Sequence, residues 1–337
     1  MTIRALKPQF FSTRRRVTRR VASALIACFS TAVAFAANEF PARPVRMMVP
    51  APAGGPADFV GRLFAQHLTD LWGQQVVTDN RPGASGIIAA DTVVRSNPDG
   101  YTLLFGSTTI FALLPVLMKN LPYDVFRDLS LIGLVANAPH ALVVRESLPA
   151  KSVQELVAMA KQQPGKYTFA SAGPGTIVQM GGELFKYHAG IDILHVPFKG
   201  GAPATVGLLA GEVDMLVNDL SAVLTHVKSG KLRALGTAHT RRLPPLPNTP
   251  TFAELGMPGM LSSTWFGIAV PVKTPAAVRA RIVTALNKVL ARPEYADRIA
   301  GLAMEPLVLT PEQTTAFIKR EINKWQKVAT AANIRID

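Results

Sequence analysis

Cysteine is scarce: the chain of 337 residues has a single one, Cys28. If the N-terminal segment is removed after Ala36, as argued below, the rest of the chain has none, which excludes disulfides and thiol chemistry. Beyond residue 37 the sequence has no run of about 18 apolar residues, so it offers no candidate membrane span there. A basic helix, a zinc finger and interleaved aromatic and basic residues are also lacking, and we expect no nucleic-acid partner.

Acidic residues are absent from the first 36 positions, which hold seven Lys and Arg residues. Without those seven, the formal charge of +14 falls to +7, a moderately basic balance that suits a binder of anions. An apolar stretch from Val21 to Ala37 follows the basic part and includes Ala34-Phe35-Ala36, a small-x-small cleavage pattern. This order predicts a secretory signal peptide over residues 1–36 and a periplasmic location. Three alternatives stay open: an N-terminal membrane anchor, a twin-arginine signal, and lipid attachment at Cys28, which follows Leu25-Ile26-Ala27 as in a lipobox.

Apolar residues are plentiful at 48%, against 17% charged residues, which is typical of a globular protein. The length suits about two domains. Strands are predicted at Val45–Val49, from Val76, and at Tyr101–Phe105, Ala141–Val144, Tyr167–Ala170, Ile193–Val196, Val213–Val217 and Leu232–Gly236. Helices are predicted at Ala57–Leu71, Ile87–Arg95, Val153–Gln162, Thr176–His188, Ala202–Ala210, Ser221–Ser229, Ala276–Arg292 and Pro311–Ala332. This rhythm predicts an α/β fold of two lobes, with helices on both faces of parallel or mixed sheets and a cleft between the lobes.

Two loops rich in small residues connect a strand to a helix, Pro50–Asp58 and Ser171–Thr176. Small residues let a ligand approach the backbone, and the unpaired N–H groups at the start of a helix favour an anion. Ligands of open α/β sheets bind at the carboxyl ends of strands, where both loops lie. Two such loops, one in each lobe, predict a clamp for a carboxylate. Each loop alone can also be an ordinary tight turn, with Thr176 acting only as a helix cap.

Several segments occur in an order that is typical of one family: Phe40–Val45, Pro50–Asp58, Asn80–Gly86, Pro98–Leu103, Ser171–Glu183, Val196–Gly201, Gly211–Asp214, Trp265–Gly267 and Lys273–Pro275. With these segments the chain resembles the extracytoplasmic receptors of tripartite tricarboxylate transporters, often called Bug proteins. The resemblance implies a type II periplasmic-binding fold in which the chain crosses between the lobes twice. The first lobe is then formed by residues 37–140 and 264–337, and the second by residues 141–263.

The same resemblance implies a set of ligand-binding residues. Ala53, Gly54 and Gly55 form the clamp in the first lobe, and Ser171, Gly175 and Thr176 form it in the second. Asp58 corresponds to the position that contacts a ligand amine or a bridging water. The further pocket residues expected are Ser107, Thr108, Phe198 and Asp219.

One position departs from the family pattern, because Gln179 stands where a histidine is usual. Glutamine keeps a hydrogen-bond donor and an acceptor but never becomes cationic. The identity of the ligand is therefore open among dicarboxylates, tricarboxylates, amino acids and aromatic acids.

The resulting prediction is a receptor that captures a small carboxylate and delivers it to the membrane permease subunits of a tripartite transporter. We expect a monomer without cofactor, metal or catalytic residues, since the six histidines form no His-Glu-x-x-His pattern and no nucleophile elbow occurs. Two alternatives stay open, a binding protein that docks on a membrane sensor kinase and an exported enzyme on the same scaffold.

Overall fold

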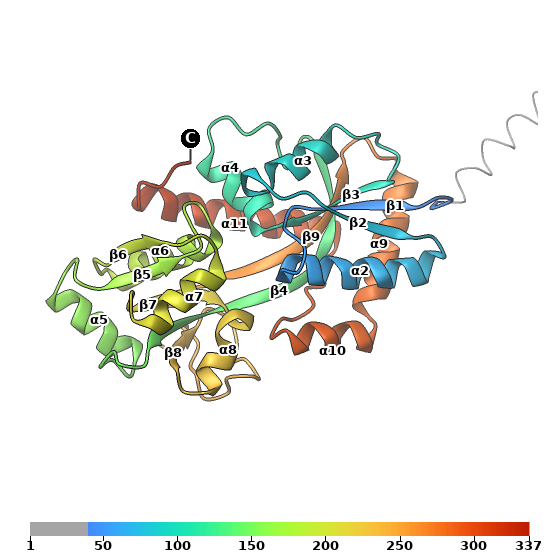
Figure 1. The fold of residues 1–337 in the computed structure, drawn as a ribbon. Coiled ribbons are helices and arrows are strands. Elements are labelled where there is room, and N and C mark those ends of the chain that lie inside the picture. Colours follow the sequence, from blue (N-terminus) through green and yellow to red (C-terminus); the bar gives the residue numbers. More distant parts are fainter. Residues whose placement is uncertain (1–39, 337) are drawn as a thin grey trace, which may run out of the picture. The chain divides into compact units, whose positions relative to one another are not determined.

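The computed structural model describes residues 40–336, and the predicted signal peptide over residues 1–36 lies outside them. The compact unit that begins at Pro44 holds all the elements below (Figure 1). Its strands are β1 (Val45–Val49), β2 (Val76–Asn80), β3 (Thr102–Ser107), β4 (Leu129–Arg145), β5 (Thr168–Ser171), β6 (Leu194–Pro197), β7 (Met215–Asp219), β8 (Leu232–Thr237) and β9 (Ser263–Pro271).

The strands follow the order β2-β1-β3-β9-β4-β7-β5-β6, and β8 pairs with β4. β1 is parallel to β2 and β3, and β5 is parallel to β6 and β7. β9 is antiparallel to both β3 and β4, and β4 is antiparallel to β7 and β8. The described residues therefore form a mixed sheet, as the alternation of strands and helices predicted.

Strand β4 is much longer than the predicted strand Ala141–Val144, which forms only its last part. Its segment Leu129–Pro139 pairs with β9, and its segment His140–Val144 pairs with β7. β4 thus runs from one region of strands, β1 to β3 with β9, into a second region, β5 to β8 (Figure 1). Every residue from Leu131 to Val144 is buried, which explains why the strand shows no alternation of apolar and polar residues.

The helices are α2 (Pro56–Trp72), α3 (Ile87–Val94), α4 (Leu114–Leu117), α5 (Val153–Gln162), α6 (Ile177–Ala189), α7 (Gly201–Ala210), α8 (Leu220–Lys228), α9 (Ala276–Leu290), α10 (Pro293–Gly301) and α11 (Pro311–Ala331). A short 3-10 helix, η1 (Ala84–Gly86), and a short π-helix, η2 (Thr109–Leu113), complete the set. Local signals explain the helix ends. α2 begins with Pro56 in its first turn and ends at Gly73 in a left-handed conformation. α11 begins with a capping box, in which Thr310 and Gln313 each bind the other's backbone.

Helices cover both regions of strands. α9 and α11 pack on β4, α3 packs on β1 and β3, and α6 and α7 pack on β5 and β7. The two-lobed α/β fold predicted from the sequence is therefore confirmed. The boundaries predicted for the lobes stay a prediction, because α11 packs against η2 and α4 on one side and against α6 on the other.

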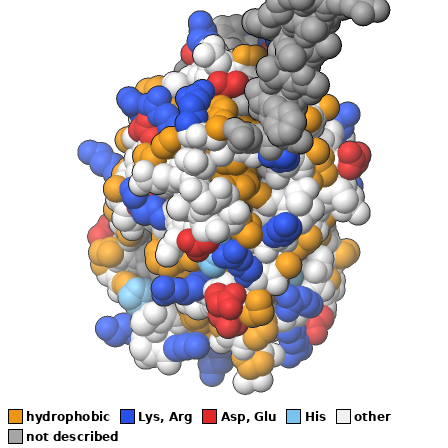
Figure 2. All heavy atoms as spheres, turned by 90° about the vertical axis from the view of Figure 1, so that its right-hand side faces the viewer, with side chains coloured by type: hydrophobic (Ala, Val, Ile, Leu, Met, Phe, Trp, Pro, Cys, Tyr) orange, Lys and Arg blue, Asp and Glu red, His pale blue; other side chains and the backbone are white. Residues whose placement is uncertain are grey.

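One face of the molecule shows how its charged residues are distributed. On the face shown in Figure 2, Lys and Arg side chains alternate with apolar and acidic ones and form no continuous basic field. Between residues 40 and 336, no helix has both the length and the apolar composition required to cross a membrane.

Candidate ligand-binding site

A cavity of about 560 Å³ opens at the carboxyl ends of the strands. This volume lies within the usual range for sites that hold small molecules. Both predicted loops contribute to its wall, through Pro50, Ala51, Pro56 and Ala57 on one side and Ala172 and Thr176 on the other. The two loops that the sequence paired as a clamp therefore face one cavity.

The first turns of four helices border this cavity. α2 contributes Pro56 and Ala57, and α6 contributes Ile177 and Val178. α7 contributes Gly201 and Ala202, and α8 is preceded by Asp219, which also lines the wall. Backbone N–H groups in a first turn have no partner within their helix, and the helix dipole is positive at that end. The starts of α2, α6 and α7 thus make their part of the wall electropositive without basic side chains, whereas the Asp219 carboxylate lies at the start of α8.

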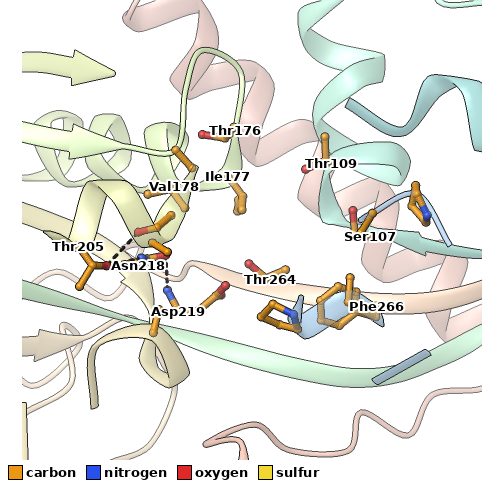
Figure 3. Close-up of a pocket in the computed structure, with 18 of the residues that line it drawn as sticks. Ser107, Thr109, Thr176, Ile177, Val178, Thr205, Asn218, Asp219, Thr264 and Phe266 are labelled. Carbon is orange, nitrogen blue, oxygen red and sulfur yellow. Dashed lines mark hydrogen bonds between the residues drawn. The ribbon is translucent and has the colours of Figure 1, made fainter. Parts of the chain in front are cut away.

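The side chains that line the cavity are mostly apolar, with hydroxyl groups between them (Figure 3). Apolar contacts come from Phe105, Ile177, Val178, Val206 and Phe266. Hydroxyl groups come from Ser107, Thr109, Thr176, Thr205 and Thr264. The ionisable side chains of this wall are Asp219 and His226, and neither Lys nor Arg is among its residues. Among residues 40–336, those of the cavity included, no cluster of three or more His, Cys, Asp or Glu side chains is arranged to hold a metal ion.

The predicted site residues divide into two groups. Ser107, Thr176 and Asp219 line the cavity directly. The others lie in the loops that form the wall or in the layer behind it: Ala53, Gly54, Gly55, Asp58, Thr108, Ser171, Gly175, Gln179 and Phe198. Their role as ligand contacts stays a prediction, and several have a structural task that the sequence did not indicate.

Asp58 braces the first loop. Its carboxylate accepts hydrogen bonds from the backbone N–H of Gly54 at 2.9 Å, from Arg62 Nε at 3.0 Å and from Asn80 Nδ2 at 2.9 Å. Burial by itself raises the pKa of Asp58, but these hydrogen bonds outweigh it and hold the pKa below its ordinary value. Asp58 is therefore an ionised, fully paired carboxylate, and one N–H of the predicted clamp is already in use.

Ser171, Gln179 and His195 form a comparable brace behind the second loop. Ser171 Oγ lies 2.6 Å from His195 Nε2, and Gln179 Nε2 lies 3.4 Å from His195 Nδ1. The other end of the Gln179 amide accepts a hydrogen bond from the N–H of Gly175 at 2.7 Å. Gln179 thus uses both its donor and its acceptor to hold the loop, and the imidazole in this layer is supplied by β6.

Thr108 and Phe198 also support the wall from behind. Thr108 is fully buried, and its Oγ1 accepts a hydrogen bond from the N–H of Trp265 at 2.9 Å, which ties the end of β3 to β9. The ring of Phe198 lies against Gly207 on α7, where a Cβ atom would come within 2.4 Å of it. Both residues position elements of the wall, and their contact with the ligand stays a prediction.

Several lining residues were not predicted. The first turns of α7 and α8 follow strands β6 and β7, so the rule that selected the first two loops would also have found Gly201, Ala202 and Ala222. Thr264 and Phe266 lie on β9, a strand that the sequence did not predict, and only its pairing with β3 and β4 brings them to the wall. Asn218 is buried and holds the wall together through hydrogen bonds with Thr205 and the backbone of Asp219 (Figure 3).

The buried position of His195 beside Ser171 and Gln179 leads to a prediction about how the stability of the protein depends on pH. Burial, with a smaller contribution from Lys186, lowers the pKa of His195, and burial also lowers the pKa of His67 and His188. A histidine whose pKa is lowered by folding contributes stability that is complete above its unfolded pKa of about 6.5 and is lost as pH falls toward the folded pKa. We expect the free energy of unfolding to fall as pH drops below about 6.5, and His195→Gln to make that fall smaller.

Denaturant unfolding of both proteins at several pH values measures this difference. Glu183, whose pKa is raised by burial, acts in the opposite direction at lower pH, but equally in both proteins. An equal fall in the wild type and in His195→Gln would contradict the prediction.

The two-lobed α/β fold, with a cavity bordered by helix N-termini at the strand ends, defines a solute-binding protein. Comparison with known proteins makes this more specific. A model of the family described as "Tripartite tricarboxylate transporter family receptor" matches residues 60–334. Protein BugT of Bordetella pertussis is 36% identical over 312 residues, which cover 92% of this chain and 96% of BugT. The chain belongs to the tripartite tricarboxylate transporter receptor family, as its ordered segments predicted.

Solved structures of two similar proteins support this family assignment. The structure of R. palustris Rpa4515 with adipate has a TM-score of 0.78 and 33% identity, and the match covers 88% of this chain and 99% of that chain. MatC (Rpa3494) from Rhodopseudomonas palustris with bound malate has a TM-score of 0.74 and 28% identity, with coverage of 86% and 99%. Members of this family are extracytoplasmic receptors and not enzymes.

Proposed function

We propose that the cavity captures a small carboxylate for delivery to the membrane subunits of a tripartite transporter. The observation that carries this proposal is the convergence of the α2 and α6 first turns on one cavity. The adipate and malate bound to Rpa4515 and MatC, which share the fold, support a carboxylate as the ligand.

The carboxylate contacts that we propose are backbone N–H groups and hydroxyl groups. Ala57, Ile177 and Val178 occupy first-turn positions on the wall, where N–H groups have no partner within the helix. Ser107 adds a hydroxyl group from the end of β3. The Thr176 hydroxyl already donates to the Gly173 carbonyl at 2.7 Å and accepts from the N–H of Gln179 as the cap of α6, so a bond from it to the ligand requires that the first of these be exchanged. Hydrogen bonds to a charged group contribute about 1.5–3 kcal/mol each, so a few of them stabilise a bound carboxylate appreciably.

The remaining predicted residues keep a proposed role in shaping the clamp. Ala53 and Gly55 lie in the first loop beside lining residues. Gly54 and Gly175 donate their N–H groups to Asp58 and Gln179, so a direct bond to the ligand requires that these internal bonds be exchanged. Contacts from both loops favour a closed form over an open one by their difference in affinity for the ligand.

The proposal also covers the location of the receptor, its oligomeric state and its transporter partner. We infer export by the N-terminal signal peptide to the periplasm, action as a monomer, and docking of the loaded receptor on permease subunits. Lipid attachment at Cys28 is the alternative for the N-terminus.

A thermal-shift screen of the purified mature protein against a library of carboxylates tests the proposal. A ligand that binds only the folded state stabilises it by about 2.7 kcal/mol at a hundredfold excess over its Kd. We expect a clear rise of the Tm with at least one acid. A well-folded sample whose Tm stays constant with every acid, after unfolding and refolding to release any ligand carried from the host, would overturn the carboxylate assignment.

A further inference from the structure

Asp219 stands at the end of β7, immediately before α8, and its side chain faces the cavity near Thr264 (Figure 3). The side chain is 21% exposed, and it makes no capping hydrogen bond to α8. Its Oδ1 atom is buried and makes no hydrogen bond within the described residues, although Nε2 of His140 lies 3.1 Å away without hydrogen-bond alignment. Leaving such an oxygen unpaired costs free energy, so a partner from a ligand would stabilise it.

The group next to Asp219 is His140, which is completely buried on β4. Its Nε2 atom lies 3.1 Å from Asp219 Oδ1 and 3.2 Å from Thr264 Oγ1, while its Nδ1 lies 2.9 Å from Ser262 Oγ. Hydroxyl groups both donate and accept, so Ser262 and Thr264 satisfy the two imidazole nitrogens in either tautomer, while the contact with Asp219 Oδ1 lacks the alignment of a hydrogen bond. Asp219 Oδ1 therefore still lacks a hydrogen-bond donor at this end of the cavity.

No other side chain of the wall supplies that donor. Asn218 is occupied by the backbone of Asp219 and by Thr205, and the wall contains neither Lys nor Arg. Asp58 offers a contrast, because its carboxylate is paired with Arg62, Asn80 and Gly54 behind the first loop. Asp219 is thus the acidic side chain of the wall, in mostly apolar surroundings where charges are screened weakly.

We propose that Asp219 is a specificity residue that selects a carboxylate carrying a hydrogen-bond donor, above all an ammonium group, at its opposite end. This inference rests on the proposed function, which places the ligand's carboxylate at the first turns of α2 and α6. An ammonium group forms a charge-assisted hydrogen bond with Asp219. A second carboxylate at the same point meets a like charge, which weakens its binding. The site thus takes an ω-amino acid in preference to a dicarboxylate of equal length.

Calorimetric titration with matched pairs of ligands tests the proposal. Each pair consists of an α,ω-dicarboxylate and the ω-amino acid of equal chain length, and the series runs from about four to eight carbons, a range suited to the cavity volume of about 560 Å³. The unsubstituted monocarboxylate of each length serves as a neutral reference. In the wild type we expect the amino acid to bind roughly tenfold or more tightly than the matching dicarboxylate.

Asp219→Asn removes the charge and keeps the shape of the side chain. We expect it to reduce the preference for the amino acid to below about threefold, mainly because dicarboxylates bind more tightly. Asp192→Asn is the matched control, since Asp192 is 60% exposed, lies outside the cavity wall and pairs with Lys186. This control should keep the wild-type ratio, and equal Tm values for the three proteins show that they are folded alike.

The outcomes separate this inference from the proposed function. Tighter binding of dicarboxylates to the wild type, or a preference that Asp219→Asn leaves unchanged, overturns the role of Asp219 and leaves a carboxylate receptor. If no member of any series binds to the folded wild type, the carboxylate assignment itself fails, and the role of Asp219 fails with it.

Discussion

Replacing Trp265 with alanine should lower the free energy of unfolding by about 3–5 kcal/mol, the usual cost of removing a large buried aromatic side chain. Trp265 is 0% exposed on β9. Its ring stacks on Phe111 of η2, with centroids 6.1 Å apart, and meets the edge of Phe317 of α11 at 5.4 Å. The substitution therefore leaves a cavity where three elements meet, and urea unfolding measures the loss.

Two further variants sharpen this prediction. The indole Nε1 of Trp265 is buried without a hydrogen-bond partner among the described residues, so Trp265→Phe also removes an unsatisfied donor and should cost far less than alanine. Phe59 on α2 is 43% exposed, and Phe59→Ala should cost less than about 1 kcal/mol. A cost for Trp265→Ala no larger than that for Phe59→Ala would contradict this packing role.

Placing tryptophan at position 57 should weaken ligand binding by roughly a hundredfold or more, because the new ring occupies space that the ligand needs. Ala57 lies in the first turn of α2 and lines the cavity between the two predicted loops. A partly exposed position in a first turn accepts a large side chain without breaking the helix, so folding should be preserved. Calorimetric titration with the acid identified in the thermal-shift screen measures the affinity.

Gln66→Trp is the matched control for Ala57→Trp. Gln66 is exposed on the same helix and is not part of the cavity wall, so this variant should bind as the wild type does. Equal affinity of Ala57→Trp and Gln66→Trp would place the ligand outside this cavity. Position 57 is a cleaner test than the neighbouring Gly54, whose φ of 87° lies in the left-handed region, so that any other residue there also strains the loop.

Most helices and strands could be predicted because short apolar runs, the helical spacing of apolar residues and turn residues all lie within a few positions of each other along the chain. The strand Val45–Val49 and the helix Val153–Gln162 have the predicted bounds, and many other ends differ by one or two residues. The two strand segments that were missed share a cause. β9 and the first part of β4 are buried on both faces, so they lack the alternation that marks a strand, and their pairing joins segments more than a hundred residues apart. α10 was also missed, although Pro293 stands in its first turn.

The two loops of the candidate site were predictable for a similar reason. Val45–Asp58 and Thr168–Thr176 each contain a strand, then a turn rich in small residues, then the start of a helix. This local order places each loop at the carboxyl end of a strand. What the sequence did not indicate is which polar groups are already in use. Asp58 and Gln179 were expected near the ligand, yet their hydrogen bonds hold Gly54 and Gly175 in place.

The sequence by itself determined the α/β class, the family and the two facing loops, because each depends on residues that are close along the chain or on an order of short segments. The tertiary structure alone decided the state of Asp219. Its Oδ1 atom is buried 3.1 Å from Nε2 of His140 on β4 but makes no hydrogen bond there, because the imidazole is bound to Thr264 and Ser262, which lie 124 and 122 residues from His140 along the chain. Pairings over such distances depend on how the strands meet, and no local pattern records them.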